Sequence, residues 1–254
     1  MVKTIFKIIA FILLLGYLLV AGFIYGFWRD EPHYKGIKIV VDYPSDEAHF
    51  VTESAIRQLI TSKPGFKCKG QPFDAVNTLE LGQYIEEHNR LVRHATCYHT
   101  PDSLLRIDIE QRNPIIRVKS SVSINDDMGH SMHDFFIDRD GAMMPAQTGT
   151  AIHLPIVTGT VKKKDVKQLH DFALFLKDED FWSDFITQIY YRENGDVELI
   201  PRIGDHCILL GPLEDYETKL DHVRSFYDKV LPRKGWNAYS VINVKFKGQV
   251  VGEK

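Results

Sequence analysis

The chain opens with one long apolar run. From Ile8 to Trp28 there is no charged residue, whereas Lys3 and Lys7 precede the run and Arg29, Asp30 and Glu31 follow it. A helix needs about 20 apolar residues to cross the hydrocarbon core of a bilayer, and only a helix satisfies its own backbone hydrogen bonds there. The run therefore predicts a transmembrane helix over 8–28 behind a short tail, 1–7. Because the lysines lie before the run, the positive-inside rule predicts a cytoplasmic N-terminus.

A cleaved signal peptide is the competing interpretation of this run. Signal peptides have apolar regions of about 7–15 residues followed by a cleavage site with small residues. This run is longer, and its best cleavage candidate, Val20-Ala21-Gly22, lies inside it. A buried helix of a soluble core is also disfavoured, because the run is apolar on every face. We therefore predict an uncleaved anchor, with everything from Arg29 onward outside the cytoplasm.

The segment that follows the anchor alternates between strand and helix patterns. Thr52 stands where an N-cap is expected, ahead of apolar residues at helical spacing. Leu105, Ile107 and Ile109 alternate with charged residues, which is the period of a half-buried strand. The predicted elements are a strand over 37–43, a helix after Thr52, a helix over 77–88, and strands over 91–98 and 104–110. This β-α-α-β-β order predicts a small domain, 33–112, with two helices on one face of a sheet.

From residue 113 the pattern changes to short strands joined by turns. Asp140-Gly141 and Asn194-Gly195 each separate two apolar runs, as in β-hairpins. Two amphipathic helices are predicted, over 166–176 and from Gly211-Pro212 to Val230. A short strand over 153–157 and a long final strand over 239–251 complete the prediction. The fold class is α+β, with a second mixed domain, 113–254, dominated by an antiparallel sheet with two flanking helices.

Composition narrows the function. The formal net charge is −3, so a nucleic-acid partner is not expected. The three cysteines, Cys68, Cys97 and Cys207, form no C-x-x-C motif and do not predict a disulfide framework. A Cys68–Cys97 bridge is left open, because the exported domains enter an oxidising compartment.

Two polar stretches are candidates for chemistry. His130, His133 and Asp134 lie close together, but their spacing lacks the helical H-E-x-x-H pattern of zinc enzymes. Asp138 and Asp140 are paired carboxylates of the kind used in glycoside hydrolysis, yet the following Gly141 indicates a turn. The sequence contains no G-x-S-x-G, P-loop or G-x-G-x-x-G motif. We predict no catalytic residue, no metal ligand and no cofactor.

Several phrases, in this order behind an anchor, resemble the FtsQ/DivIB family of bacterial cell-division proteins. They are FFIDRDGAMMP (135–145), HLPIVTG (153–159), ENGDVELI (193–200), GDHCILLG (204–211) and YSVINVKFKGQVV (239–251). The resemblance covers nearly the whole chain. It implies a POTRA-like first exported domain followed by an FtsQ-type β domain.

The resemblance also implies a function. It suggests a non-enzymatic, single-pass scaffold in the inner membrane, with its exported domains in the periplasm and enriched at the division septum. Such a scaffold links early division proteins to an FtsB–FtsL pair and to septal wall synthesis. The POTRA-like domain is expected to recruit other divisome members. The alternative, from a different class, is an envelope-anchored cell-wall enzyme or wall-binding module.

The resemblance places the capture of an FtsB-like partner at the last strand, where a basic–aromatic pair corresponds to Lys245-Phe246. On the predicted strand, Lys245 and Lys247 share one face, and the opposite face faces the core. An exposed strand edge accepts a partner strand through main-chain hydrogen bonds. The expected contact residues are Val244, Lys245, Phe246, Lys247 and Gly248. The other possibility is that the lysines only protect a bare edge from aggregation.

Overall fold

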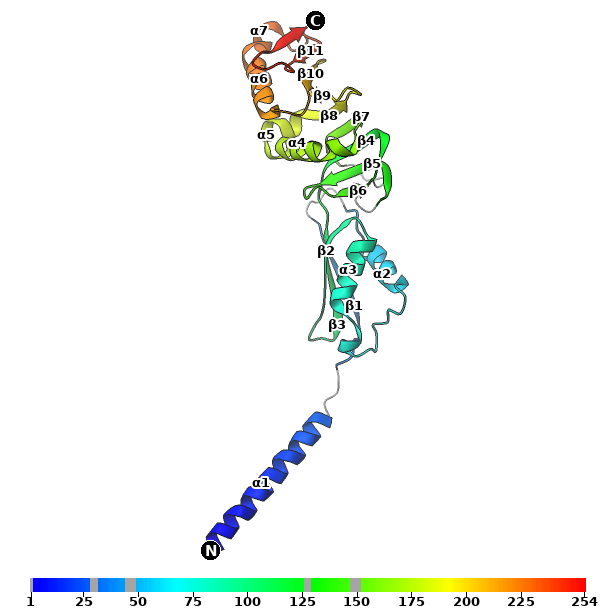
Figure 1. The fold of residues 1–254 in the computed structure, drawn as a ribbon, viewed down its shortest axis with the longest axis vertical. Coiled ribbons are helices and arrows are strands. Elements are labelled where there is room, and N and C mark those ends of the chain that lie inside the picture. Colours follow the sequence, from blue (N-terminus) through cyan, green and yellow to red (C-terminus); the bar gives the residue numbers. More distant parts are fainter. Residues whose placement is uncertain (1, 28–31, 44–48, 126–128, 147–151) are drawn as a thin grey trace.

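The computed structural model describes residues 2–27, 32–43, 49–125, 129–146 and 152–254. It contains an N-terminal helix, a three-stranded sheet and a nine-stranded sheet, which follow one another along the molecule (Figure 1). The predicted α+β class, with an apolar helix, a small domain with a three-stranded sheet and a mixed-sheet domain, is confirmed.

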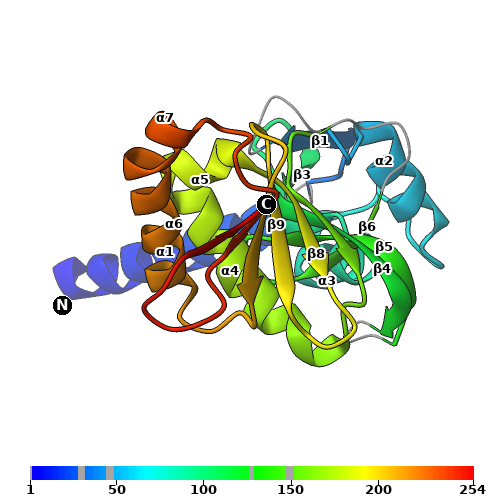
Figure 2. The same ribbon diagram turned by 90° about the horizontal axis from the view of Figure 1, so that it is seen from above.

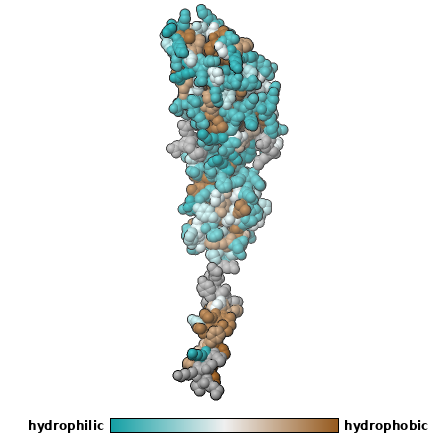
Figure 3. Space-filling view, turned by 60° about the vertical axis from the view of Figure 1, so that its left-hand side comes forward, coloured by the Kyte–Doolittle hydropathy of each residue, from teal (hydrophilic) through white to brown (hydrophobic). Residues whose placement is uncertain are grey.

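Helix α1 (Val2–Phe27) carries the apolar run. Its segment Ile5–Ile24 has a mean hydropathy of 2.5 and is long and apolar enough to cross a membrane. Brown, hydrophobic side chains cover much of this helix, whereas the two sheet domains present mainly hydrophilic ones (Figure 3). The helix begins at Val2, so most of the expected tail 1–7 is helical. The predicted end of the anchor, Trp28, lies outside the described residues, and the predicted start, Ile8, lies within α1.

The domain that follows α1, called the first domain below, has the predicted β-α-α-β-β order. Its elements are β1 (Gly36–Asp42), α2 (Glu53–Ser62), a 3-10 turn η1 (Phe73–Ala75), α3 (Thr78–His88), β2 (Val92–His99) and β3 (Leu104–Gln111). The sheet order is β1-β3-β2, with β1 parallel and β2 antiparallel to β3. Thr52 caps α2, because its Oγ1 accepts the Ala55 N–H at 3.2 Å. The alternating residues Leu105 and Ile107 are fully buried under the helices.

The second sheet is mixed. Its elements are β4 (Pro114–Asn125), β5 (Ser131–Asp138), β6 (Met143–Pro145), β7 (Ile156–Gly159), η2 (Lys163–Asp165), α4 (Val166–Asp178), α5 (Asp180–Phe185), β8 (Ile186–Tyr191), β9 (Val197–Pro201), β10 (Cys207–Gly211), α6 (Tyr216–Lys229), α7 (Leu231–Lys234), β11 (Val241–Asn243) and β12 (Val251–Glu253). The strand order is β12-β11-β10-β9-β8-β7-β4-β5-β6. Figures 1 and 2 show α4, α5, α6 and α7 gathered on one side of this sheet. Their apolar residues, such as Phe172 and Leu220, share one core with the strands.

Four sequence predictions in this domain are corrected. Strand β7 begins at Ile156 rather than at 153. Helix α6 begins at Tyr216 rather than at Pro212, because Gly211 and Asp215 both have positive φ and interrupt a helical path. Helix α5, which packs Trp182 and Phe185 into the core, was not predicted. The long final strand over 239–251 is wrong, because the chain forms two short strands, β11 and β12, joined by a loop.

The two sheet domains share part of a core. Phe136 and Met144, from the β5–β6 hairpin, are buried in the core of the first domain. The Phe136 ring lies 5.8 Å from the ring of Phe50, measured between centroids. Side chains of the second domain therefore help to stabilise the first, and the two domains are held together by apolar burial as well as by the chain.

Candidate binding site at the C-terminal strand pair

Strand β11 is the inner member of the terminal pair. It runs parallel to β10, with Ile208 opposite Ile242, and antiparallel to β12, with Ile242 opposite Gly252. Ile242 and Val244 are both buried, and the Val244 N–H donates to the Leu209 carbonyl at 3.0 Å. The predicted alternation of core-facing residues therefore holds as far as Val244. Val244 is a core residue and offers no side chain to a partner.

The strand ends at Asn243 for a local reason. The Asn243 Oδ1 accepts the Lys245 N–H at 3.1 Å, an Asx-type turn that offers the backbone an alternative to the sheet ladder. Beyond it, Phe246 to Gly248 form a turn, and Gly248 has φ = 74° in the left-handed region that glycine adopts readily. The predicted straight strand over Lys245–Gly248 is thus replaced by a loop.

Lys245 points back into the domain. Its Nζ lies 2.7 Å from the Asp196 Oδ2, and its side chain is about one-third exposed (34%) while that of Asp196 is 9% exposed. The Lys245 side chain passes over Gly211, and a Cβ at that position would lie 2.7 Å from the Lys245 Cγ. Burial alone raises the pKa of Asp196, but hydrogen bonds from Lys245 and Asn194 hold it below its usual value. Lys245 is therefore the partner of a buried carboxylate, which sequence reasoning missed because the two residues are distant in the chain.

Phe246 and Lys247 are the outward-facing members of the predicted set. The Phe246 side chain is 56% exposed, and Lys247 is exposed beside it. Phe246 was expected on the buried face of a strand with Ile242, but the turn after Asn243 rotates it outward. The predicted residues are thus split into two groups. Val244 and Lys245 anchor the loop, and Phe246, Lys247 and Gly248 form its surface.

A groove of about 430 Å³ lies between this loop and the start of α6. Besides Lys245, Phe246, Lys247 and Gly248, its lining residues are Pro212, Glu214, Asp215, Thr218, Lys219 and His222. The Lys219 Nζ donates to the Pro212 carbonyl at 2.8 Å. Burial lowers the pKa of Lys219, although the carboxylates of Asp215 and Glu214 oppose the shift. The α6 residues of this groove were not predicted, because only the fold brings α6 beside the loop.

Strand β12 is the first strand of the sheet order, so one of its sides has no strand neighbour in the part of the chain that the structure describes. Val251 on this strand is 42% exposed. The inner side is secured to β11, with the Ser240 N–H donating to the Glu253 carbonyl at 2.8 Å. The edge predicted for the last strand therefore belongs to β12. An unpaired edge of this kind can accept an extended segment.

The polar stretches that raised the enzyme alternative have structural contacts. Asp134 on β5 forms an ion pair with Arg117, whose Nη2 lies 2.8 Å from the Asp134 Oδ2. This contact lowers the pKa of Asp134. Over the described ranges, no group of three or more His, Cys, Asp or Glu side chains is arranged to hold a metal ion. Neither His130 nor His133 belongs to such a group.

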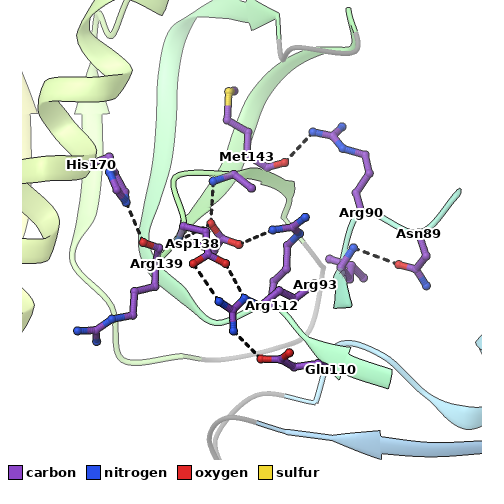
Figure 4. Close-up of polar contacts among 12 residues, drawn as sticks. Asn89, Arg90, Arg93, Glu110, Arg112, Asp138, Arg139, Met143 and His170 are labelled. Carbon is purple, nitrogen blue, oxygen red and sulfur yellow. Dashed lines mark hydrogen bonds and ion pairs between the residues drawn. The ribbon is translucent and has the colours of Figure 1, made fainter. Parts of the chain in front are cut away.

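Asp138 and Asp140 belong to the domain junction, where Figure 4 shows Asp138 beside Arg112. The buried Asp138 accepts the Asp140 and Ala142 N–H groups at 3.0 and 2.7 Å, and Arg112 lies 2.8 Å from its other oxygen. Asp140 reaches the first domain, where the Arg93 Nε donates to it at 2.6 Å. The predicted turn is confirmed. Both carboxylates hold the hairpin in place against the preceding domain.

An apolar helix long enough to cross a membrane, followed by a small three-stranded domain and a mixed-sheet domain with a strand edge, fits the class of membrane-anchored interaction proteins. The model of the family described as FtsQ/DivIB, C-terminal related, matches residues 113–253, more than half of the chain, and that of the POTRA-like domain matches residues 35–110. A comparison with curated proteins found no match. The chain belongs to the FtsQ/DivIB, C-terminal related family, which connects it with cell division. FtsQ/DivIB-type families are non-catalytic scaffolds.

Proposed function

We propose that this protein is a single-pass scaffold of the bacterial divisome. It links early division proteins to a pair of FtsB-like and FtsL-like membrane proteins, and through them to septal wall synthesis. The family match, the apolar helix and the free sheet edge support this function. The POTRA-like sheet, whose outer strands are β1 and β2, serves other divisome members.

The partner-binding site of the proposal combines the β12 edge with the loop before it. An FtsB-like segment pairs with β12 by main-chain hydrogen bonds. Phe246 supplies an apolar contact, and Lys247 meets an acidic side chain of the partner. Gly248 allows the tight turn that follows these two residues. Val244 and Lys245 act from within by fixing the loop. The observation that carries this proposal is the position of β12 at the end of the sheet order.

Photocrosslinking in dividing cells tests the site. A benzoyl-phenylalanine at Val251 should crosslink to FtsB-like and FtsL-like proteins, identified by mass spectrometry. The same group at Leu79, which is 72% exposed on α3, is the matched control for an exposed apolar position away from β12. Crosslinks to division proteins from Leu79 but not from Val251 would exclude the β12 edge as the binding site but would still support a divisome scaffold. No division protein at either position, in cells where other divisome pairs crosslink, would favour the envelope-enzyme or wall-binding alternative.

The proposal also fixes topology and location. The N-terminus is cytoplasmic, both sheet domains are periplasmic, and the protein concentrates at the septum. Alkaline phosphatase fused after Lys254 should be active, because it folds only after export. A periplasm-compatible fluorescent protein fused there should concentrate at midcell, and uniform fluorescence along the envelope in dividing cells would contradict septal enrichment.

A further inference from the structure

A small hollow of about 290 Å³ lies on the first domain, beside the start of β1. It shares no lining residue with the groove beside α6. Two half-buried apolar side chains, Ile37 and Phe66, line it together with three basic ones, Arg57, Lys67 and Lys69. Among the described residues, no aspartate or glutamate belongs to this lining. The hollow therefore presents positive charge beside apolar surface.

The three basic residues are not equally available to a ligand. The Arg57 Nη2 lies 2.6 Å from the Glu53 Oε1, so this charge is already paired. Lys67 and Lys69 are exposed, and neither has an ion-pair partner in the part of the chain that the structure describes. Cys68, which lies between them in the sequence, is buried. Two lysines on either side of a buried residue are thus available to an anion.

The exposed carboxylates of the neighbouring turns do not line the hollow. Asp102 lies in the turn between β2 and β3, where it accepts a hydrogen bond from the Thr100 hydroxyl. That hydrogen bond lowers the pKa of Asp102, and Lys38 and Lys35 contribute to the same shift. Asp74 lies in η1. Neither aspartate belongs to the lining, so the charges of Lys67 and Lys69 are not cancelled within the hollow.

The chain limits the distance between this hollow and α1. Residues 28–31 follow α1, and Figure 1 shows the first domain joined to it at the end where β1 begins. Fully extended, the chain from Phe27 to Tyr34 spans at most about 25 Å. The Gly70 N–H donates to the Tyr34 carbonyl at 2.7 Å, which fastens the loop with the two lysines to the start of the domain. When α1 crosses a bilayer, the hollow stays near the lipid headgroups.

We propose that this hollow binds the phosphate group of an anionic phospholipid in the bilayer that holds α1. The inference rests on the membrane anchor of the proposed function and adds a second contact with the membrane. Lys67 and Lys69 bind the phosphate, because lysines are attracted to anionic membrane surfaces. Ile37 and Phe66 contact the less polar glycerol part.

The short connection to α1 is what identifies the occupant. A short tether holds a binding site and its ligand at an effective concentration in the millimolar range, so a weak affinity for each headgroup is sufficient. An acidic protein segment has to reach the same lysines from solution, whereas the headgroups are held beside them. Binding at the hollow also fixes the tilt of the first domain relative to the bilayer.

The test uses the full chain in lipid nanodiscs. One set of discs contains phosphatidylcholine alone, and the other contains equal parts of phosphatidylcholine and phosphatidylglycerol. Hydrogen–deuterium exchange of residues 66–71, measured by mass spectrometry, should be about five- to tenfold slower in the discs with phosphatidylglycerol. Exchange in β12 should be the same in both sets. Equal exchange of residues 66–71 in the two sets would overturn the proposal.

Two matched double charge reversals locate the binding. Lys67→Glu combined with Lys69→Glu should abolish the slowing. Lys164→Glu combined with Lys167→Glu changes the net charge equally on the second domain and should leave the slowing intact. All four lysines are exposed, so both variants should stay folded. The same loss of slowing in both variants would overturn the proposal.

Two further outcomes separate lipid binding from its alternatives. Inorganic phosphate that slows the exchange in phosphatidylcholine discs as much as phosphatidylglycerol does would overturn the proposal in favour of a small-anion site. Co-elution of the chain with the discs is measured first. A chain that does not enter the discs would overturn both the anchor and the lipid site, whereas an inserted chain without lipid-dependent slowing would overturn the lipid site alone.

Discussion

Lys245 and Asp196 form an ion pair that connects the C-terminal loop to the β8–β9 hairpin, with the Lys245 Nζ 2.7 Å from the Asp196 Oδ2. The pair divides the residues of the proposed binding loop into two roles. Lys245 supports the loop from inside, and its neighbours Phe246 and Lys247 face outward.

The first prediction concerns stability. Lys245→Met should lower the free energy of unfolding by about 1–2 kcal/mol, because Asp196 then lacks its cationic partner. Exposure of Lys245 to solvent keeps the loss moderate. Lys247→Met, the matched control, should change it by less than about 0.5 kcal/mol. Urea unfolding, monitored by tryptophan fluorescence, measures the free energy of unfolding of both variants. Equal changes in the two variants would show that the ion pair contributes nothing to stability.

The second prediction concerns partner capture. Phe246→Ala should weaken binding of an FtsB-like partner at least about fivefold, since an exposed aromatic group is a common interface anchor. Lys247→Glu should weaken it further by charge repulsion. Both variants should stay folded, because neither side chain is buried. Pull-down from membranes measures the capture, and unchanged partner levels with both variants would remove the loop from the site. Lys245→Glu is a poor probe, because it places a second carboxylate beside Asp196.

The third prediction contrasts the two aspartates of the junction. Asp138→Ala should destabilise the protein by about 3 kcal/mol, because it leaves Arg112 and two backbone N–H groups without their acceptor. Asp140→Ala removes an exposed ion pair with Arg93 and should cost less than about 1 kcal/mol. Calorimetry measures the difference. A catalytic role for the pair predicts instead that both variants keep their stability and lose an activity.

The fourth prediction concerns pH. His206 is buried with its Nε2 2.8 Å from the Tyr227 hydroxyl, and burial lowers its pKa below 6.5 although Asp205 opposes the shift. As the pH falls, the imidazole of His206 is therefore protonated in the unfolded chain before it is protonated in the folded protein. The free energy of unfolding declines below about pH 6.5 as a result. The decline between about pH 7 and pH 5 should be smaller in His206→Gln. An identical decline in the variant would assign it to other groups.

The fifth prediction concerns the cysteines of the first domain. Burial raises the pKa of the Cys68 thiol to about 11 and that of Cys97 to about 12, and both cysteines are free. Little thiolate is present at about pH 8, so iodoacetamide should label them slowly in the folded protein and rapidly after unfolding. Mass spectrometry of peptides measures the labelling. Failure to label after unfolding without a reductant would instead reveal the Cys68–Cys97 bridge that the sequence left open.

Local patterns predicted the elements whose cause is local. The alternation at Leu105, Ile107 and Ile109, the cap at Thr52 and the Asn194-Gly195 turn each depend on neighbouring residues, and each has its predicted structure. The candidate site was predicted only in part. The Asn243 side chain bonds the Lys245 N–H and ends the strand, and the partner of Lys245 is Asp196, far away in the sequence. An alternating pattern carries no information on either contact.

The shared core of the two domains sets a geometric requirement for any partner at β12. Phe136 and Met144 join the second domain to the first, and the first domain follows α1 along the chain. In Figure 1, β12 lies at the end of the second domain that faces away from the first. Under the proposed function, the two joined domains hold β12 at a fixed distance from the first domain. A partner segment anchored in the same membrane then needs a stalk long enough to reach β12, whatever its side chains are.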